Sequence, residues 1–154
     1  MSIKKTVFLV DDHPVVRQGC KAILSERNDI TVVGEAPTGL EALEQISLLK
    51  PTIVIMDLNL PDLSGIEIVR RLKAQPRGLH IVILSVHVDD VYVHRALEAG
   101  ASAYVVKEGA VQELGDAIDA VTAGHMYLSP VISRTVIRTY LQRPARSPSS
   151  EGET

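Results

Sequence analysis

Polar side chains that could hold a cation or react with a phosphoryl group stand directly after short apolar runs of the sequence. They are Asp11 and Asp12 after 6–10, Asp57 after 53–56, Ser85 after 81–84, and Lys107 after 104–106. Runs of this kind, separated by helix-length amphipathic stretches, are typical of buried strands in a parallel sheet. Ligands of such sheets bind beyond the carboxyl ends of the strands. We therefore expect these side chains to meet at one edge of the sheet.

This set of residues suits a divalent metal ion beside a phosphoryl group. Mg²⁺ prefers oxygen ligands, which Asp11, Asp12 and Asp57 can supply, and a cation would relieve the repulsion among three crowded carboxylates. Phosphoryl transfer needs positioning and charge compensation more than covalent help. Asp57 ends the expected central strand and is the candidate nucleophile. Lys107 would neutralise phosphoryl oxygens as a point charge, and the Ser85 hydroxyl would donate to another oxygen.

The hydrophobic pattern alternates strand and helix five times. The predicted strands are 5–10, 31–35, 52–57, 80–85 and 103–106, and the predicted helices are 14–26, 39–48, 65–74, 89–99 and 110–123. Pro14 fits the first turn of a helix, where its missing N–H costs little, and Gly100 is placed to end a helix as a left-handed cap. Such alternation predicts a doubly wound α/β fold with right-handed crossovers.

Composition narrows the class of protein. The 154 residues suit one domain with its own core, and 45% hydrophobic and 23% charged residues are typical of a globular protein. The net charge of −3 gives no electrostatic footprint for nucleic acid. We find no apolar run long enough to span a bilayer and no signal peptide, so the cytoplasm is the expected location. The single Cys20 is expected to fill the core.

The sequence changes character after residue 124. Ser129 and Pro130 resemble a helix N-cap followed by proline at the first helical position, and an apolar stripe follows them. We expect residues 125–143 to form a linker helix. Residues 146–154 are polar, without apolar side chains to bury, and the tail 144–154 is expected to be disordered.

Two long motifs carry a resemblance to a known family. Residues 10–19 read VDDHPVVRQG and residues 56–65 read MDLNLPDLSG. Together with Ser85 and Lys107 they make residues 4–124 similar to the receiver domain of bacterial two-component response regulators, and more specifically to the NarL/FixJ type. We therefore expect a receiver domain over residues 1–124.

The resemblance implies a flavodoxin-like (CheY-like) five-stranded sheet of order 2-1-3-4-5 with five flanking helices. It implies that Asp12 and Asp57 contact Mg²⁺ directly, Asp11 largely through water, and Asn59 through its main-chain carbonyl. It also implies that Tyr104 is the aromatic residue whose rotamer changes when the Ser85 hydroxyl group moves.

Two departures from the family pattern matter. Glu108 stands where the family often has proline after the lysine. A cis bond before a residue other than proline costs about 3 kcal/mol, so a trans 107–108 peptide bond is expected. Regulators of this type continue into a helix-turn-helix domain of the LuxR type, and residues after 124 cannot form one. DNA binding is therefore expected only through a C-terminal domain outside this chain.

The resemblance implies a signalling switch rather than an enzyme. A sensor histidine kinase would supply the phosphoryl group to Asp57, and the acyl phosphate, with close to two added negative charges, would favour a homodimer. The competing interpretation is a receiver-like interaction module that works without phosphorylation. A phosphatase of the haloacid-dehalogenase type would need an acidic residue at position 59, where this sequence has Asn59. A flavodoxin or nucleotide-binding domain would need a phosphate-binding loop after the first strand, and this sequence has none there.

The histidines offer no paired metal-ligand spacing, so solvated or packing roles are expected for them. They are His13, His80, His87, His94 and His125. His87 and Asn59 each lie two residues beyond a site residue and are expected to flank the phosphoryl group.

Overall fold

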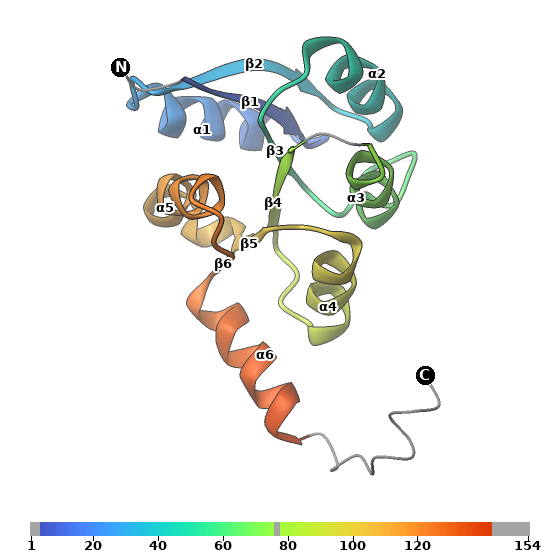
Figure 1. Cartoon of the computed structure of the whole chain (residues 1–154), viewed down its shortest axis with the longest axis vertical. Coiled ribbons are helices and arrows are strands. Elements are labelled where there is room, and N and C mark those ends of the chain that lie inside the picture. The colour runs from blue at the N-terminus through green and yellow to red at the C-terminus, as the bar shows by residue number, and fades with distance from the viewer. Residues whose placement is uncertain (1–3, 76–77, 143–154) are drawn as a thin grey trace.

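A parallel six-stranded sheet forms the centre of the computed structural model, which describes residues 4–75 and 78–142 (Figure 1). The strands are β1 (Lys5–Val10), β2 (Ile30–Ala36), β3 (Ile53–Met56), β4 (His80–Ser85), β5 (Ala103–Val106) and β6 (Tyr127–Leu128). The helices are α1 (Pro14–Ser25), α2 (Gly39–Leu49), α3 (Gly65–Lys73), α4 (Asp90–Ala99), α5 (Ala110–Thr122) and α6 (Pro130–Gln142). One 3-10 turn, η1 (Lys107–Gly109), joins β5 to α5.

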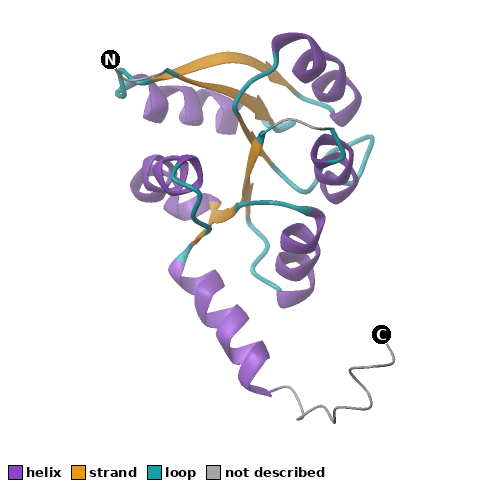
Figure 2. Cartoon of the chain, viewed as in Figure 1, coloured by secondary structure: helices purple, strands orange, loops and turns teal. Residues whose placement is uncertain are grey.

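The strand order is β2-β1-β3-β4-β5-β6, which confirms the predicted flavodoxin-like sheet and adds one strand to it. The predicted alternation of strands and helices is also confirmed (Figure 2). The extra strand β6 pairs in parallel with β5 through two residues, Tyr127 and Leu128. A two-residue strand carries no periodic signal, which explains why the sequence did not predict it.

Side chains that alternate along each strand build one core on each face of the sheet. Phe8 and Met56 point into the core beneath α2, α3 and α4, whereas Val7, Leu9 and Ile55 point into the core beneath α1 and α5. Figure 1 shows the same division, with α1 and α5 on one side of the sheet and α2, α3 and α4 on the other. A sheet covered on both faces leaves its strand ends as the place for polar chemistry.

Local sequence sets where the helices begin and end. Pro14 opens α1, as predicted. The side chains of Thr38 and Ser64 cap α2 and α3 by accepting hydrogen bonds from backbone N–H groups. Gly100 ends α4 at a φ of 121°, which an L side chain rarely adopts, so its predicted left-handed cap is confirmed. No cis peptide bond occurs in the described ranges, so the predicted trans bond before Glu108 is also confirmed.

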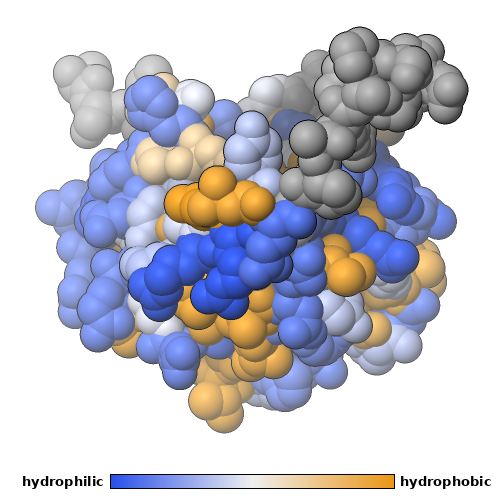
Figure 3. All heavy atoms as spheres, turned by 90° about the horizontal axis from the view of Figure 1, so that it is seen from below, coloured by the Kyte–Doolittle hydropathy of each residue, from blue (hydrophilic) through white to orange (hydrophobic). Residues whose placement is uncertain are grey.

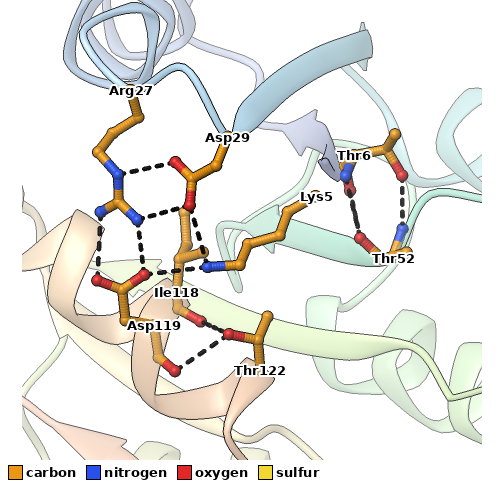
Figure 4. A network of polar contacts seen from close by, with 8 residues as sticks. All are labelled: Lys5, Thr6, Arg27, Asp29, Thr52, Ile118, Asp119 and Thr122. Atoms are coloured by element: carbon orange, nitrogen blue, oxygen red, sulfur yellow. Dashed lines mark hydrogen bonds and ion pairs between the residues drawn. The ribbon is translucent and has the colours of Figure 1, made fainter. Parts of the chain in front are cut away.

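A four-residue ion-pair network closes the edge of the sheet where β1 begins (Figure 4). Lys5 Nζ lies 3.1 Å from Asp119 Oδ1 and 3.4 Å from Asp29 Oδ2. Arg27 lies 3.0 Å from Asp29 and 2.7 Å from Asp119. The network ties β1, the loop before β2 and α5 together with two cations and two anions.

Helix α6 packs against the core of the α/β domain instead of standing apart from it. Ile132 is fully buried in the core cluster that also holds Tyr104 and Val93, and Thr139 Oγ1 donates to Asp90 of α4 at 3.4 Å. Three apolar residues of α6 stay exposed, namely Ile137, Tyr140 and Leu141. Figure 3, a view from below Figure 1, shows hydrophobic and hydrophilic side chains interleaved on that face.

A helix, α6, occupies most of the range 125–143 in which we predicted a linker helix, whereas residue 143 and the predicted disordered tail 144–154 lie outside the described residues. Cys20 is buried, and burial raises the pKa of its thiol to about 11, which confirms its expected packing role. Within the described part of the chain, no helix combines the length and the apolar character that crossing a membrane requires.

Candidate metal centre

The strand ends bring the predicted site residues to one edge of the sheet. The β1–β3 pairing ends with Val10 opposite Met56, so Asp11 and Asp57 emerge side by side, and Asp57 N donates to Val10 O at 3.0 Å. Ser85 ends β4, on the other side of β3, and Lys107 follows β5. The convergence expected from the sequence therefore holds for these side chains.

Lys107 is the cation that holds the carboxylates together. Its Nζ lies 2.8 Å from Asp57 Oδ2 and 3.0 Å from Asp11 Oδ2. Burial lowers the pKa of Lys107, but the hydrogen bonds and charges of Asp57 and Asp11 outweigh burial and leave its pKa raised. The ammonium group is therefore charged at neutral pH and positioned beside the Asp57 carboxylate.

The carboxylates fit a hard cation. One ligand atom from each of Asp11, Asp12, His13 and Asp57 lies within 4.8 Å of the others. Asp11 and Asp57 are only 5% and 4% exposed. Asp11 Oδ2 is buried and is paired with Lys107 Nζ, 3.0 Å away. Three carboxylates against one ammonium leave negative charge that a divalent ion bound by oxygen would offset.

His13 contacts the acid pair, which the sequence did not predict. Its Nδ1 lies 2.9 Å from Asp11 Oδ1 and 3.1 Å from Asp12 Oδ1, and its side chain is 61% exposed. Its spacing from the aspartates along the chain is that of any turn before a helix, so no periodic signal marked it.

A close approach of α3 to the end of β3 fixes the loop that carries Asp57. A Cβ on Gly65 would lie 2.5 Å from Leu58 Cα and 2.8 Å from Asp57 O, so only glycine fits there. Asp57 Oδ1 accepts a hydrogen bond from Asn59 N at 3.1 Å, which orients the carboxylate. Asp62 accepts hydrogen bonds from the backbone N–H groups of Leu40 and Gly39, which lower the pKa of Asp62 and attach the loop to α2.

The predicted switch residues form a second cluster beside the carboxylates. Ser85 Oγ accepts from His87 N at 3.0 Å, and the fully buried Tyr104 donates its hydroxyl to His87 O at 2.8 Å. Burial raises the pKa of Tyr104. His87 Nε2 lies 2.7 Å from Asn59 Nδ2, and its ring stacks on Tyr92 of α4 with centroids 4.4 Å apart. The Tyr104 side chain is therefore turned into the core, and the His87 ring connects the site to α4.

Comparison with known proteins gives a consistent result. The family model described as "Response regulator receiver domain" matches residues 7–119. The transcriptional regulatory protein DegU of Brevibacillus brevis is 32% identical over 137 residues, covering 89% of this chain and 58% of DegU. Response regulator GacA of Pseudomonas protegens is 35% identical over 142 residues, covering 92% of this chain and 67% of GacA.

The fold has close structural relatives as well. The crystal structure of a LuxR-family two-component response regulator from Aurantimonas sp. SI85-9A1 matches with a TM-score of 0.86 and 36% identity. That match covers 90% of this chain and 99% of the other. The chain spans 58% to 67% of the length of DegU and GacA.

Proposed function

The chain belongs to the response regulator receiver domain family, whose members are phosphorylation-dependent signalling switches, and we propose that Asp57 is its phospho-acceptor. The contact that carries this proposal is the 2.8 Å ion pair of Asp57 with Lys107 at the end of the central strand β3. A buried carboxylate beside a fixed cation and two more carboxylates is the arrangement that phosphoryl transfer to oxygen requires.

The chain's own residues account for most of the transfer step. Asn59 N holds Asp57 Oδ1, and Lys107 holds Oδ2. One carboxylate oxygen forms the new P–O bond as the P–N bond of a phosphohistidine donor breaks, and the imidazole leaves with the electron pair. Lys107 then neutralises the phosphoryl oxygens. The donor we propose is a sensor histidine kinase.

The residues proposed to hold Mg²⁺ are Asp12 and Asp57 directly, Asp11 through water, and Asn59 through its main-chain carbonyl. When bound, Mg²⁺ would supply positive charge against the oxygens of the transferring group. Asp11 contributes a nearly buried carboxylate whose Oδ2 lies 3.0 Å from Lys107 Nζ.

We propose that Ser85 and Tyr104 transmit the change. A phosphoryl group on Asp57 would attract the Ser85 hydroxyl, which now accepts from His87 N. Because Tyr104 is bonded to His87 O and His87 stacks on Tyr92, movement of this loop would reach α4. The output is a changed α4–β5–α5 surface that favours a homodimer.

We propose residues 1–124 as the receiver domain and 125–143 as a linker helix that docks on it. Ser129 supports docking, because its buried Oγ accepts from the backbone N–H of Val106, the residue before Lys107, and donates to Glu113 at 2.7 Å. The relative DegU is a transcriptional regulatory protein, and we propose that control of transcription would likewise act through a helix-turn-helix domain outside this chain. The cytoplasm, where such a kinase domain and DNA meet, is the proposed location.

Transfer from acetyl phosphate tests the acceptor without a kinase, since the domain would catalyse its own phosphorylation. Intact-mass spectrometry should show one added acid-labile phosphoryl group in the wild type with Mg²⁺, and none in Asp57→Asn. Asp62→Asn, which alters an aspartate of the same loop outside the cluster, serves as the control and should still be labelled. Labelling of Asp57→Asn would refute the assignment, and no labelling of the wild type would favour a phosphorylation-independent interaction module.

A further inference from the structure

The C-terminal segment β6–α6 covers the surface that we propose as the output of the switch. Strand β6 pairs with β5, which would otherwise be the open edge of the sheet. Helix α6 then packs against α4 (Figure 1), and Thr139 Oγ1 lies 3.4 Å from Asp90 Oδ2 of α4. Tyr127 and Ser129 both donate to Glu113 of α5. The segment therefore contacts each of α4, β5 and α5, where a second copy of the chain would have to bind.

The start of α6 is bonded to the strand that carries the proposed switch residue. Ser129 N donates to Tyr104 O at 2.9 Å, and Ser129 Oγ accepts from Val106 N at 3.0 Å. Val106 directly precedes Lys107, which pairs with the proposed phospho-acceptor. Ile132, in the first turn of α6, is fully buried in the core cluster that holds Tyr104. A rearrangement around the phospho-acceptor would therefore act on the attachment of α6.

The contact between α6 and α4 contains a polar atom without a partner. His94 follows Asp90 by four residues, so it lies one turn along the same face of α4, the face that meets Thr139 of α6. Tyr92 and Arg95 lie on the other side of α4, toward α3. His94 Nε2 is buried and has no hydrogen-bond partner among the described residues. A buried nitrogen without a hydrogen bond costs stability, so α6 is held less tightly than an apolar contact would hold it.

The rest of α6 makes few contacts that would oppose its release. Of the residues from Pro130 to Gln142, Ile132 is the one that is buried. Ile137, Tyr140 and Leu141, farther along the helix, are exposed. Segments with few buried apolar contacts are those that open locally while the remaining fold stays intact.

We propose that α6 is an autoinhibitory cover: it occupies the α4 side of the output surface, and a second copy binds there only after α6 leaves. This inference rests on the homodimer proposed above. Phosphorylation of Asp57 shifts the equilibrium between covered and open protein by weakening the attachment of Ser129 to β5. Both copies must open, so a tenfold smaller open fraction weakens the dimer about a hundredfold.

A reversible cross-link between α6 and α4 tests the inference in the full chain. The double variant Asp90→Cys with Thr139→Cys places thiols where two side chains now lie 3.4 Å apart, and the native Cys20 is buried. Sedimentation with Mg²⁺ and beryllofluoride, a phosphoryl mimic, is measured on the monomer with an internal cross-link and again after reduction. We expect the reduced protein to dimerise and the cross-linked protein to dimerise at least about tenfold more weakly. Equal dimerisation of the two forms would overturn the inference.

His94→Leu tests the same equilibrium without a cross-link. The leucine removes the unpartnered nitrogen, so amide hydrogen exchange in α6 should slow about threefold, and the dimer should weaken about tenfold because both copies carry the change. A merely structural role of α6 predicts no weaker dimer. His125→Leu makes the same substitution at an exposed position outside the α4–α6 contact and should change neither measurement. Faster exchange in α6, or a tighter dimer, in His94→Leu would contradict the inference.

Hydrogen exchange of the wild type separates this inference from the proposed function. After labelling of Asp57 with acetyl phosphate, the amides of α6 should exchange at least about tenfold faster, whereas those of α2 on the far side of the sheet should not change. A labelled protein whose α6 keeps its protection would refute the autoinhibitory cover alone. A wild type that takes up no phosphoryl group would refute the proposed phospho-acceptor, whatever α6 does.

Discussion

The two edges of the sheet contain similar charged residues in opposite states of balance. At the edge where β1 begins, two cations and two carboxylates pair completely in Lys5, Arg27, Asp29 and Asp119 (Figure 4). At the edge where β1 ends, the carboxylates among the described residues outnumber the ammonium group of Lys107 that pairs with them. The first edge needs no ligand, whereas the second holds charge that a cation would neutralise. The two edges therefore differ in their excess of buried charge of one sign rather than in their number of ion pairs. We call the second edge, which holds Asp11, Asp57 and Lys107, the functional edge.

Lys107→Met should be the most damaging change. It removes the cation from buried Asp57 and Asp11 and should lower the free energy of unfolding by about 3 kcal/mol in metal-free buffer. Mg²⁺ should restore part of that loss. Lys5→Met at the opposite edge should cost less than about 1 kcal/mol, because its partners are more exposed. Urea unfolding of both variants checks the difference, and equal losses would contradict it.

Gly65→Ala should damage the functional edge by forcing two backbone segments apart. Its Cβ would press on Leu58 and on the carbonyl of Asp57, so we expect a loss of about 2 kcal/mol and weaker Mg²⁺ binding. The matched control is Gly19→Ala in α1, where nothing lies within 4 Å of the added carbon. Gly19→Ala should stabilise the protein by about 0.5 kcal/mol. Unfolding curves that place the two variants together would argue against a tight approach at Gly65.

Asp57→Asn should stabilise the metal-free protein by about 1 kcal/mol, because it removes the repulsion between this carboxylate and those of Asp11 and Asp12. Asp119→Asn should do the opposite, since its carboxylate sits between Lys5 and Arg27. Melting temperatures measured in chelator check the signs. A destabilised Asp57→Asn would mean that Lys107 already balances the functional edge.

Acid should weaken the balanced edge in a defined range. The hydrogen bond from Arg27 lowers the pKa of Asp29 from 3.8 to about 2. Because the pKa is lower in the folded state, this carboxylate stabilises the fold above about pH 4, and the contribution disappears as the pH falls toward 2. Melting temperatures across that range should fall less steeply in Asp29→Asn than in the wild type. Parallel curves would show that the network contributes little.

The sequence predicted the fold and the main site because each depends on strong local patterns. Apolar strands ended by Asp11, Asp57, Ser85 and Lys107 predicted both the alternation of strands and helices and the edge at which these side chains meet. The resemblance to receiver domains added the strand order, which alternation alone leaves open.

Other features depend on contacts that no local pattern encodes. The strand β6 is too short to show periodicity, and His13 reaches the carboxylates only because the turn before α1 folds back on Asp11. The bond between His87 and Asn59 joins loops 28 positions apart in the chain. The complete pairing of Lys5 with Asp119 likewise appears only once β1 and α5 are packed together.

Thermal melting during a titration with Mg²⁺, at constant ionic strength, tests most directly whether the carboxylate edge binds a cation. In the wild type, stability should rise by mass action, by about 2.7 kcal/mol when free Mg²⁺ is about 100 times its dissociation constant. Asp12→Asn should respond much less, and Asp119→Asn should respond like the wild type. A melting temperature of the wild type that stays constant across the titration would contradict a metal site at this edge.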